Sequence, residues 1–183
     1  MSNVYIIGLG MLRFNKYPDR GVRDMAHEVT RLALEDAGLD AKDLESAFFS
    51  NTFWGMFSNQ HSIKGQVVLR SMGIDTIPVT NVENACATSS TAFNQACAMV
   101  TAGVYDVVLA VGFEKLFSED KTKTFAAFDG AVDTENDAGM MGALDALSKK
   151  SGVPVDIENA GKTRSVFMDI YAHMALAHMK NYG

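Results

Sequence analysis

Cys86 lies in the segment of this chain whose residue types best suit chemistry. The run from Asn84 to Ser90, NACATSS, follows a predicted strand and opens a predicted helix whose first turn contains only small residues. A cysteine at a helix N-terminus lies near the positive end of the helix dipole and near unpaired backbone N–H groups, which favour thiolate over thiol. The same N–H groups would help to hold a developing oxyanion. Cys86 is therefore our candidate nucleophile, and a buried structural cysteine is the alternative.

The other cysteine and the histidines give no comparable signal. Cys97 lies in the middle of the same predicted helix among Ala96, Ala98 and Met99, where we interpret it as a small hydrophobic residue. Eleven residues of helix would separate the two cysteines by about 16 Å, too far for a disulfide. We therefore expect two free thiols and a reducing compartment, either the cytoplasm or an organelle matrix.

No metal site is expected from the sequence. The four histidines form no H-E-x-x-H pair, and none stands near a cysteine in the sequence. His173 and His178 are five residues apart and do not share a helix face, so we interpret both as polar positions on an amphipathic helix.

The elements that must position Cys86 alternate between strands and helices. Apolar, β-rich segments predict four strands, at 4–10, 46–54, 76–84 and 106–116. Periodic apolar residues that end at glycines predict the helices between them, from 24 to 38, from 61 to 73 and from 86 to 103. This order indicates an α/β fold with a mostly parallel sheet and helices on both faces.

The chain changes character after Phe117. A polar, glycine-containing stretch comes first, and helices are predicted at about 140–150 and 164–183. We therefore interpret residues 1–117 as an α/β domain and residues 118–183 as a loop or cap region.

Composition excludes several classes of protein. The 183 residues are 48% hydrophobic and 21% charged, as in ordinary globular domains rather than disordered chains. The net charge of −6 and the lack of any Lys/Arg cluster argue against nucleic acid or an anionic membrane surface as a partner. No window approaches the roughly 18 consecutive apolar residues of a membrane-spanning helix.

The order of these elements and two of their sequences resemble the N-terminal half of a thiolase. The two sequences are NVENACATSSTAF at 81–93 and DVVLAVGFEKL at 106–116, and the likeness is greatest to the sterol-carrier-protein type of thiolase. In that family a strand delivers the nucleophilic cysteine to the start of a buried helix, and a Gly-Phe-Glu-Lys run ends the next strand. The resemblance assigns these roles to Cys86 and to residues 112–115. It covers most of 3–117 and, more loosely, 165–183, where HMALAHMKNYG is similar to a helix of the family's loop domain.

This resemblance implies Claisen chemistry on coenzyme A thioesters. The Cys86 thiolate would take an acyl group from a 3-ketoacyl-CoA, or from acetyl-CoA in synthesis, and a second CoA-bound species would resolve the acyl-enzyme. Coenzyme A enters as part of the substrate, no bound cofactor is implied, and no CoA-contacting residue is assigned. Family members also use a second α/β half that supplies a histidine, an acid/base cysteine and much of the oxyanion hole. Such a half does not follow within these 183 residues.

Several alternatives remain open at this point. The chain is a fragment of a longer protein, one subunit of a split enzyme, or a non-catalytic thiolase-like scaffold. Within the enzyme class, the competing expectation is a steroid side-chain aldolase subunit that works with a small zinc-containing, acyl-CoA-binding partner. Half of a two-domain core would leave a broad apolar face, so we expect a homodimer or a hetero-oligomer. By resemblance, the segment 76–84 is the expected dimer edge.

Overall fold

The computed structural model of the chain describes residues 3–156, 159 and 164–183. The chain folds into two compact units, Met1–Phe117 and Ser118–Gly183, which are taken in turn below.

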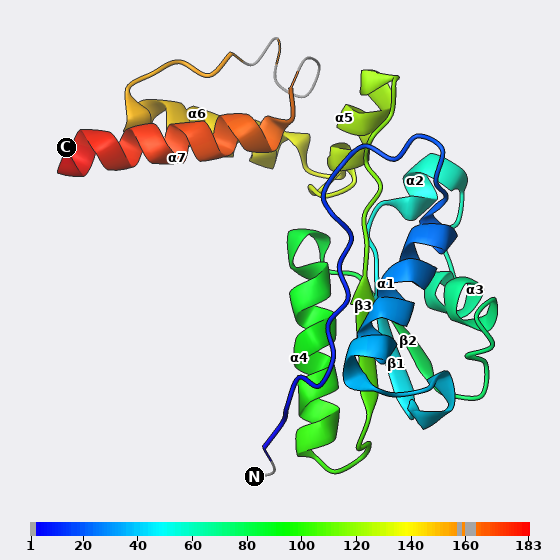
Figure 1. Cartoon of the computed structure of the whole chain (residues 1–183). Helices are drawn as coiled ribbons and strands as arrows, with labels where there is room; N and C mark the ends of the chain where they lie inside the picture. The colour runs from blue at the N-terminus through cyan, green and yellow to red at the C-terminus, as the bar shows by residue number, and fades with distance from the viewer. Residues whose placement is uncertain (1–2, 157–158, 160–163) are drawn as a thin grey trace. The chain divides into compact units, whose positions relative to one another are not determined.

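A three-stranded parallel sheet forms the centre of the first unit (Figure 1). Strand β1 (Ser46–Ser50) lies between β2 (Val79–Val82) and β3 (Val108–Gly112). In the register of the sheet, Phe49 of β1 lies opposite Asn81 of β2 and Val111 of β3. All five residues of β1 are buried, as expected for a central strand covered on both faces. The predicted α/β fold with a parallel sheet is therefore confirmed.

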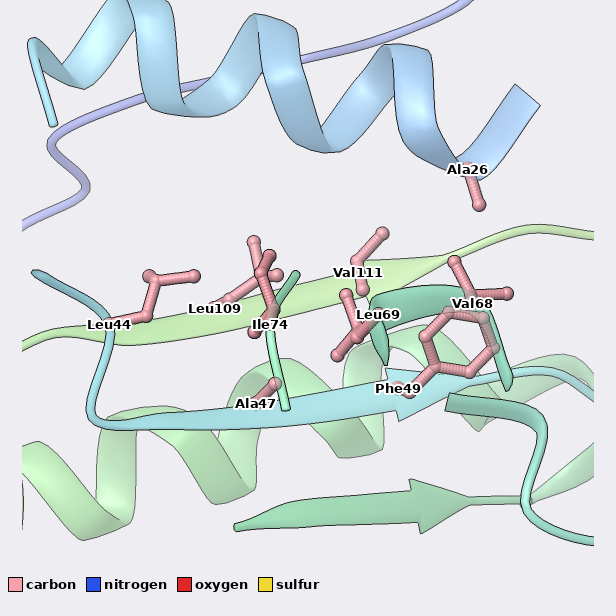
Figure 2. Packing of buried hydrophobic residues seen from close by; sticks show 9 residues of the cluster. All are labelled: Ala26, Leu44, Ala47, Phe49, Val68, Leu69, Ile74, Leu109 and Val111. Carbon is pink, nitrogen blue, oxygen red and sulfur yellow. The ribbon is translucent and has the colours of Figure 1, made fainter. Parts of the chain in front are cut away.

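Helices cover both faces of this sheet. Helices α1 (Val22–Ala37) and α3 (Lys64–Arg70) pack on one face, and α4 (Thr88–Thr101) packs on the other (Figure 1). Because successive strand residues point to opposite faces, Phe49 contributes to the α1/α3 side and Phe48 to the α4 side. Figure 2 shows the larger cluster, in which the Phe49 ring lies beside Val68 and Leu69 of α3. Its buried members are Ala26, Leu44, Ala47, Phe49, Val68, Leu69, Ile74, Leu109 and Val111.

Several element boundaries differ from those predicted. The strand expected over 46–54 ends at Ser50, and a short helix, α2 (Trp54–Ser58), follows it. The helix expected over 61–73 is confined to α3. Two single turns of 3-10 helix, η1 (Ala41–Asp43) and η2 (Ala85–Ala87), complete the unit.

The predicted strand at 4–10 is wrong. These residues are extended but pair with no strand in the described part of the chain, so the sheet has three strands instead of four. Tyr5 is 73% exposed. Gly8 and Gly10 lie directly against α1, where an added Cβ would overlap with the helix backbone, and the Leu9 N–H donates to the Asp36 carboxylate at 2.8 Å. An apolar, β-rich pattern indicates a preference for extended backbone, and it does not determine whether a helix or a strand is the neighbour.

The second unit is helical. It contains α5 (Lys121–Asp129), α6 (Asp137–Ser151) and α7 (Val166–Tyr182), and α6 and α7 pack against each other. The two helices predicted at about 140–150 and 164–183 correspond to α6 and α7, whereas α5 lies in a stretch for which no helix was predicted. The Asn136 and Ser165 side chains cap the starts of α6 and α7 by accepting backbone N–H bonds. Over the residues that the structure describes, no helix has the length and apolar character needed to cross a membrane.

Candidate active site around Cys86

The carboxyl ends of the three strands lead into the segments that surround Cys86. β1 continues into Asn51 and Thr52, β2 into Asn84 and Cys86, and β3 into Glu114. Because the strands are parallel, these segments meet at one edge of the sheet, which is where open α/β sheets bind ligands.

Cys86 itself lies in the turn η2 and is exposed. Helix α4 begins at Thr88, so the expectation that Cys86 is part of that helix is wrong by two residues. The preceding residue, Ala85, has φ +43°, a left-handed conformation that side-chain-bearing residues rarely adopt. Such backbone persists only when the surroundings hold it in place. Cys97 lies within α4 as expected, half-buried, and both thiols are free.

A chain of hydroxyl groups holds the turn that carries Cys86. The Thr88 hydroxyl donates to the Ala85 carbonyl oxygen at 2.6 Å and accepts the Asn84 N–H at 2.8 Å. The hydroxyl oxygen of Thr52, from the end of β1, lies 2.8 Å from that of Thr88 and 3.2 Å from the Ala85 carbonyl oxygen. The end of β1 is thereby tied to the turn that follows β2.

Two charged side chains hold the turn around Thr52. The Lys64 ammonium, buried in α3, donates to the carbonyl oxygens of Asn51 and Thr52 at 3.0 and 3.2 Å. The Glu114 carboxylate accepts the N–H groups of Thr52 and Phe53, the latter at 3.1 Å. Burial lowers the pKa of Lys64, and the nearby Glu114 charge partly opposes this shift. Burial also raises the pKa of Glu114, against the effect of the two N–H bonds.

Each residue of the Gly-Phe-Glu-Lys run has a structural role. A side chain on Gly112 would overlap with Ser50 Oγ and lie 2.5 Å from Ser89 Oγ, so glycine lets the first turn of α4 approach the sheet. The Phe113 ring makes edge contacts with Phe49 and Trp54 at centroid distances of 5.5 and 5.6 Å. Glu114 holds the turn after β1, and the Lys115 ammonium donates to the Arg20 carbonyl oxygen. The run therefore positions the edge of the sheet that carries Cys86.

The histidines make contacts within their own units. Within the described residues of the first unit, no hydrogen bond connects a histidine to Cys86. His173 is buried in α7, with Nδ1 2.9 Å from Ser151 Oγ. His178 is exposed and lies against the Tyr182 ring at a centroid distance of 4.8 Å. Across the described residues of both units, no cluster of three or more His, Cys, Asp or Glu side chains could hold a metal ion.

The sequence pattern pointed to Cys86 but missed the residues that hold its turn. Thr52 and Lys64 carried no motif, Thr88 stood in the NACATSS run without an assigned role, and Glu114 entered only as part of a family-like run. The available signal was their position, since Thr52 and Glu114 lie just after strand ends and Lys64 and Thr88 lie at helix starts.

Comparisons with known proteins identify the family of this chain. The family model described as "Thiolase, N-terminal domain" matches residues 4–166. An acetyl-CoA acetyltransferase of Methanocaldococcus jannaschii is 33% identical over 183 residues, a match that covers 100% of this chain and 40% of that protein. Sterol carrier protein 2 of Homo sapiens is 28% identical over 186 residues, covering 100% of this chain and 30% of that protein.

Among solved structures, an Ltp2-ChsH2(DUF35) aldolase superposes with a TM-score of 0.48 at 20% identity, covering 81% of this chain and 38% of that one. The chain thus spans 40% of the length of the archaeal acetyltransferase. The family match extends over most of the chain and includes both the Cys86 turn and the Gly-Phe-Glu-Lys run. This protein belongs to the thiolase family, in which it corresponds to the N-terminal domain.

Proposed function

We propose that this chain provides the nucleophilic half of a thiolase-type acyltransferase, with Cys86 as the residue that becomes acylated. The observation that carries the proposal is an exposed cysteine at the carboxyl edge of the sheet, in a turn held by hydrogen bonds, in a member of the thiolase family. Its substrates are acyl groups carried as coenzyme A thioesters.

In the degradative direction, the Cys86 thiolate attacks the 3-keto carbon of a 3-ketoacyl-CoA. The tetrahedral oxyanion collapses, the C2–C3 bond breaks, and the electron pair passes to C2, which takes a proton and leaves as acetyl-CoA. The shortened acyl group stays on sulfur as a thioester. A second CoA thiol, losing its proton, then attacks this thioester, releases acyl-CoA and regenerates the thiolate. In the synthetic direction the acyl group comes from acetyl-CoA, and the carbanion of a second CoA-bound species resolves it.

Cys86 needs groups beyond those in the described part of the chain to complete this cycle. A proton donor for C2 and a base for the incoming thiol are required, and no histidine is bonded to Cys86 there. We propose that these groups come from a further thiolase half, either on the same polypeptide or on an associated one. Denaturing and native mass spectrometry of the protein as isolated would give the chain length and reveal any bound partner.

The same measurement separates the other functions that the family allows. A small zinc-containing partner that copurifies would favour the steroid side-chain aldolase subunit over the acyltransferase. A 183-residue homo-oligomer with no second half would favour a non-catalytic scaffold. The two free thiols support a reducing compartment such as the cytoplasm or an organelle matrix.

Acylation of Cys86 is the direct test. The protein as isolated, with any copurifying partner, is incubated with acetyl-CoA or a 3-ketoacyl-CoA, and the modified residue is located by peptide mass mapping. We expect one acyl group on Cys86 in the wild type and in Cys97→Ser, and none in Cys86→Ser. Unchanged acylation of the Cys86→Ser protein would overturn the proposal.

A further inference from the structure

We propose that Thr52 is a positioning residue for Cys86, and that Lys64 and Glu114 keep Thr52 in place. The inference deepens the proposed function and rests on it, because it concerns the geometry of the proposed nucleophile. Thr52 lies at the end of β1, whereas Cys86 follows β2, so the two residues are brought together only by the fold.

Each threonine hydroxyl has one proton to donate, which limits the possible directions of the hydrogen bonds. The short 2.6 Å distance assigns the Thr88 proton to the Ala85 carbonyl oxygen, and the Thr88 oxygen accepts the Asn84 N–H. The Thr52 proton then goes to the Thr88 oxygen at 2.8 Å or directly to the Ala85 carbonyl oxygen at 3.2 Å. In both arrangements this chain of hydroxyl groups links Thr52 to the Ala85 carbonyl, either through Thr88 or directly.

This chain ends on the peptide unit that leads into Cys86. The Ala85 carbonyl and the Cys86 N–H belong to one planar group, so a hydrogen bond that orients the carbonyl also orients Cys86. Ala85 has φ +43° and needs such support, because an unconstrained alanine would relax to a negative φ. The Thr52 hydroxyl therefore controls the orientation of the Cys86 side chain relative to the sheet edge.

Lys64 and Glu114 give Thr52 the rigidity that this role requires. Lys64 binds the carbonyl groups of the turn, and Glu114 binds its N–H groups, so the backbone of Thr52 is held from both sides. Lys64 is only 9% exposed, and burying an ammonium group is unfavourable unless it is well bonded. Its two carbonyl bonds and the Glu114 charge supply that compensation.

The test compares Thr52→Val with Thr52→Ser in a Cys97→Ser background. Valine keeps the shape of threonine without the hydroxyl, and serine keeps the hydroxyl. The rate of Cys86 alkylation by iodoacetamide is measured as a function of pH, together with the melting temperature. If Thr52 positions Cys86, Thr52→Val should change the alkylation rate by about threefold across the profile, the effect of losing one hydrogen bond, and Thr52→Ser should restore it.

Lys64 supplies a second, independent variant. Lys64→Met should change the rate in the same direction, and the double variant Lys64→Met/Thr52→Val should change it no further than Thr52→Val alone, because both act through one hydrogen-bond chain. Thr52→Ala serves if Thr52→Val does not fold. A lowered melting temperature with an unchanged alkylation profile would show that Thr52 is merely structural and would overturn the inference.

The two proposals fail in different ways. Alkylation needs no acyl transfer, so a shifted profile with no acylation of wild-type Cys86 by thioesters would contradict the proposed function and leave the positioning role standing. Normal acylation of wild-type Cys86 with identical alkylation profiles for Thr52→Val and Thr52→Ser would contradict the positioning role alone.

Discussion

Lys64 and Glu114 bind opposite sides of a single turn at the carboxyl end of the central strand. The ammonium of Lys64 donates to the carbonyl oxygen of Thr52 at 3.2 Å, and the carboxylate of Glu114 accepts the N–H of the same residue. The lysine comes from α3 and the glutamate follows β3, so the turn after β1 is bonded to both of these elements. Its conformation depends on two ionisable groups, which makes it sensitive to pH.

Glu114→Gln should alter how stability depends on pH. Burial raises the pKa of Glu114 above its ordinary value of 4.5. Just above pH 4.5 the folded protein therefore keeps a proton that the unfolded chain has lost. The stability contributed by this proton is full below 4.5 and is lost as the pH rises through the folded-state pKa. The wild type should accordingly lose stability relative to Glu114→Gln across that interval.

Urea unfolding followed by the fluorescence of Trp54, the single tryptophan, measures this difference at a series of pH values. Trp54 is well placed as a probe because its ring packs on Phe113, the neighbour of Glu114. Asp75→Asn, which removes an exposed carboxylate elsewhere in the same unit, is the control for the loss of one negative charge. A Glu114→Gln curve parallel to that of the wild type would mean that burial does not perturb the Glu114 carboxyl.

Gly112→Ala should separate the first turn of α4 from the sheet. The new methyl group would overlap with Ser50 Oγ and crowd Ser89 Oγ, and Ser50 is buried and bonded to Ser89. We expect destabilisation of about 1–3 kcal/mol, typical of overpacking. Because α4 follows the Cys86 turn, Cys86 alkylation should change as well. Gly21→Ala, where an added Cβ meets no atom within 4 Å, should change stability by less than about 1 kcal/mol. Equal stabilities for the two variants would show that Gly112 is not closely packed.

Asn81→Pro tests β2 as the edge of the proposed homodimer. β2 is an outer strand of the three-stranded sheet, and proline blocks strand pairing by removing an N–H and by its bulk. If β2 forms the dimer edge, gel filtration should show monomers. The Asn81 side chain also accepts the Gly65 N–H at 2.7 Å, so Asn81→Ala is needed as a control that loses this bond and keeps the backbone N–H. A dimer that survives in Asn81→Pro would place the interface elsewhere.

The sheet and its main helices were predictable because their signals are local. Val and Phe runs that end at polar or glycine residues predicted β1, β2 and β3, and the apolar spacing from Met25 to Ala37 predicted α1. The segment 4–10 has an equally strong local signal, yet it lies along α1 because Gly8 and Gly10 allow its backbone to reach the helix. β propensity is a property of one segment, whereas strand pairing also depends on the second segment with which it pairs.

The site was predictable only where chemistry and sequence position coincide. Cys86 has a reactive side chain and lies where a predicted strand meets a predicted helix, and both features can be seen in the sequence. The supporting contacts join Thr52 to Thr88 and to Glu114 across 36 and 62 residues of sequence. No local pattern encodes contacts at such separation, and a threonine or a lysine has many surface roles that look the same in a sequence.

The small side chains around Gly112 have a consequence for how the chain avoids misfolding. The two central residues of β1, Phe48 and Phe49, are of the same type, so a strand that slipped by one residue would exchange one phenylalanine for the other in part of its core. The end of the strand does not tolerate this shift. Ser50 is buried beside Gly112, and its hydroxyl bonds to Ser89 at 3.0 Å and to the Val111 carbonyl oxygen at 3.3 Å. Misaligned pairing would place Phe49 at this position, where its ring makes neither bond, so the contact that brings α4 to the sheet also selects against the slipped strand.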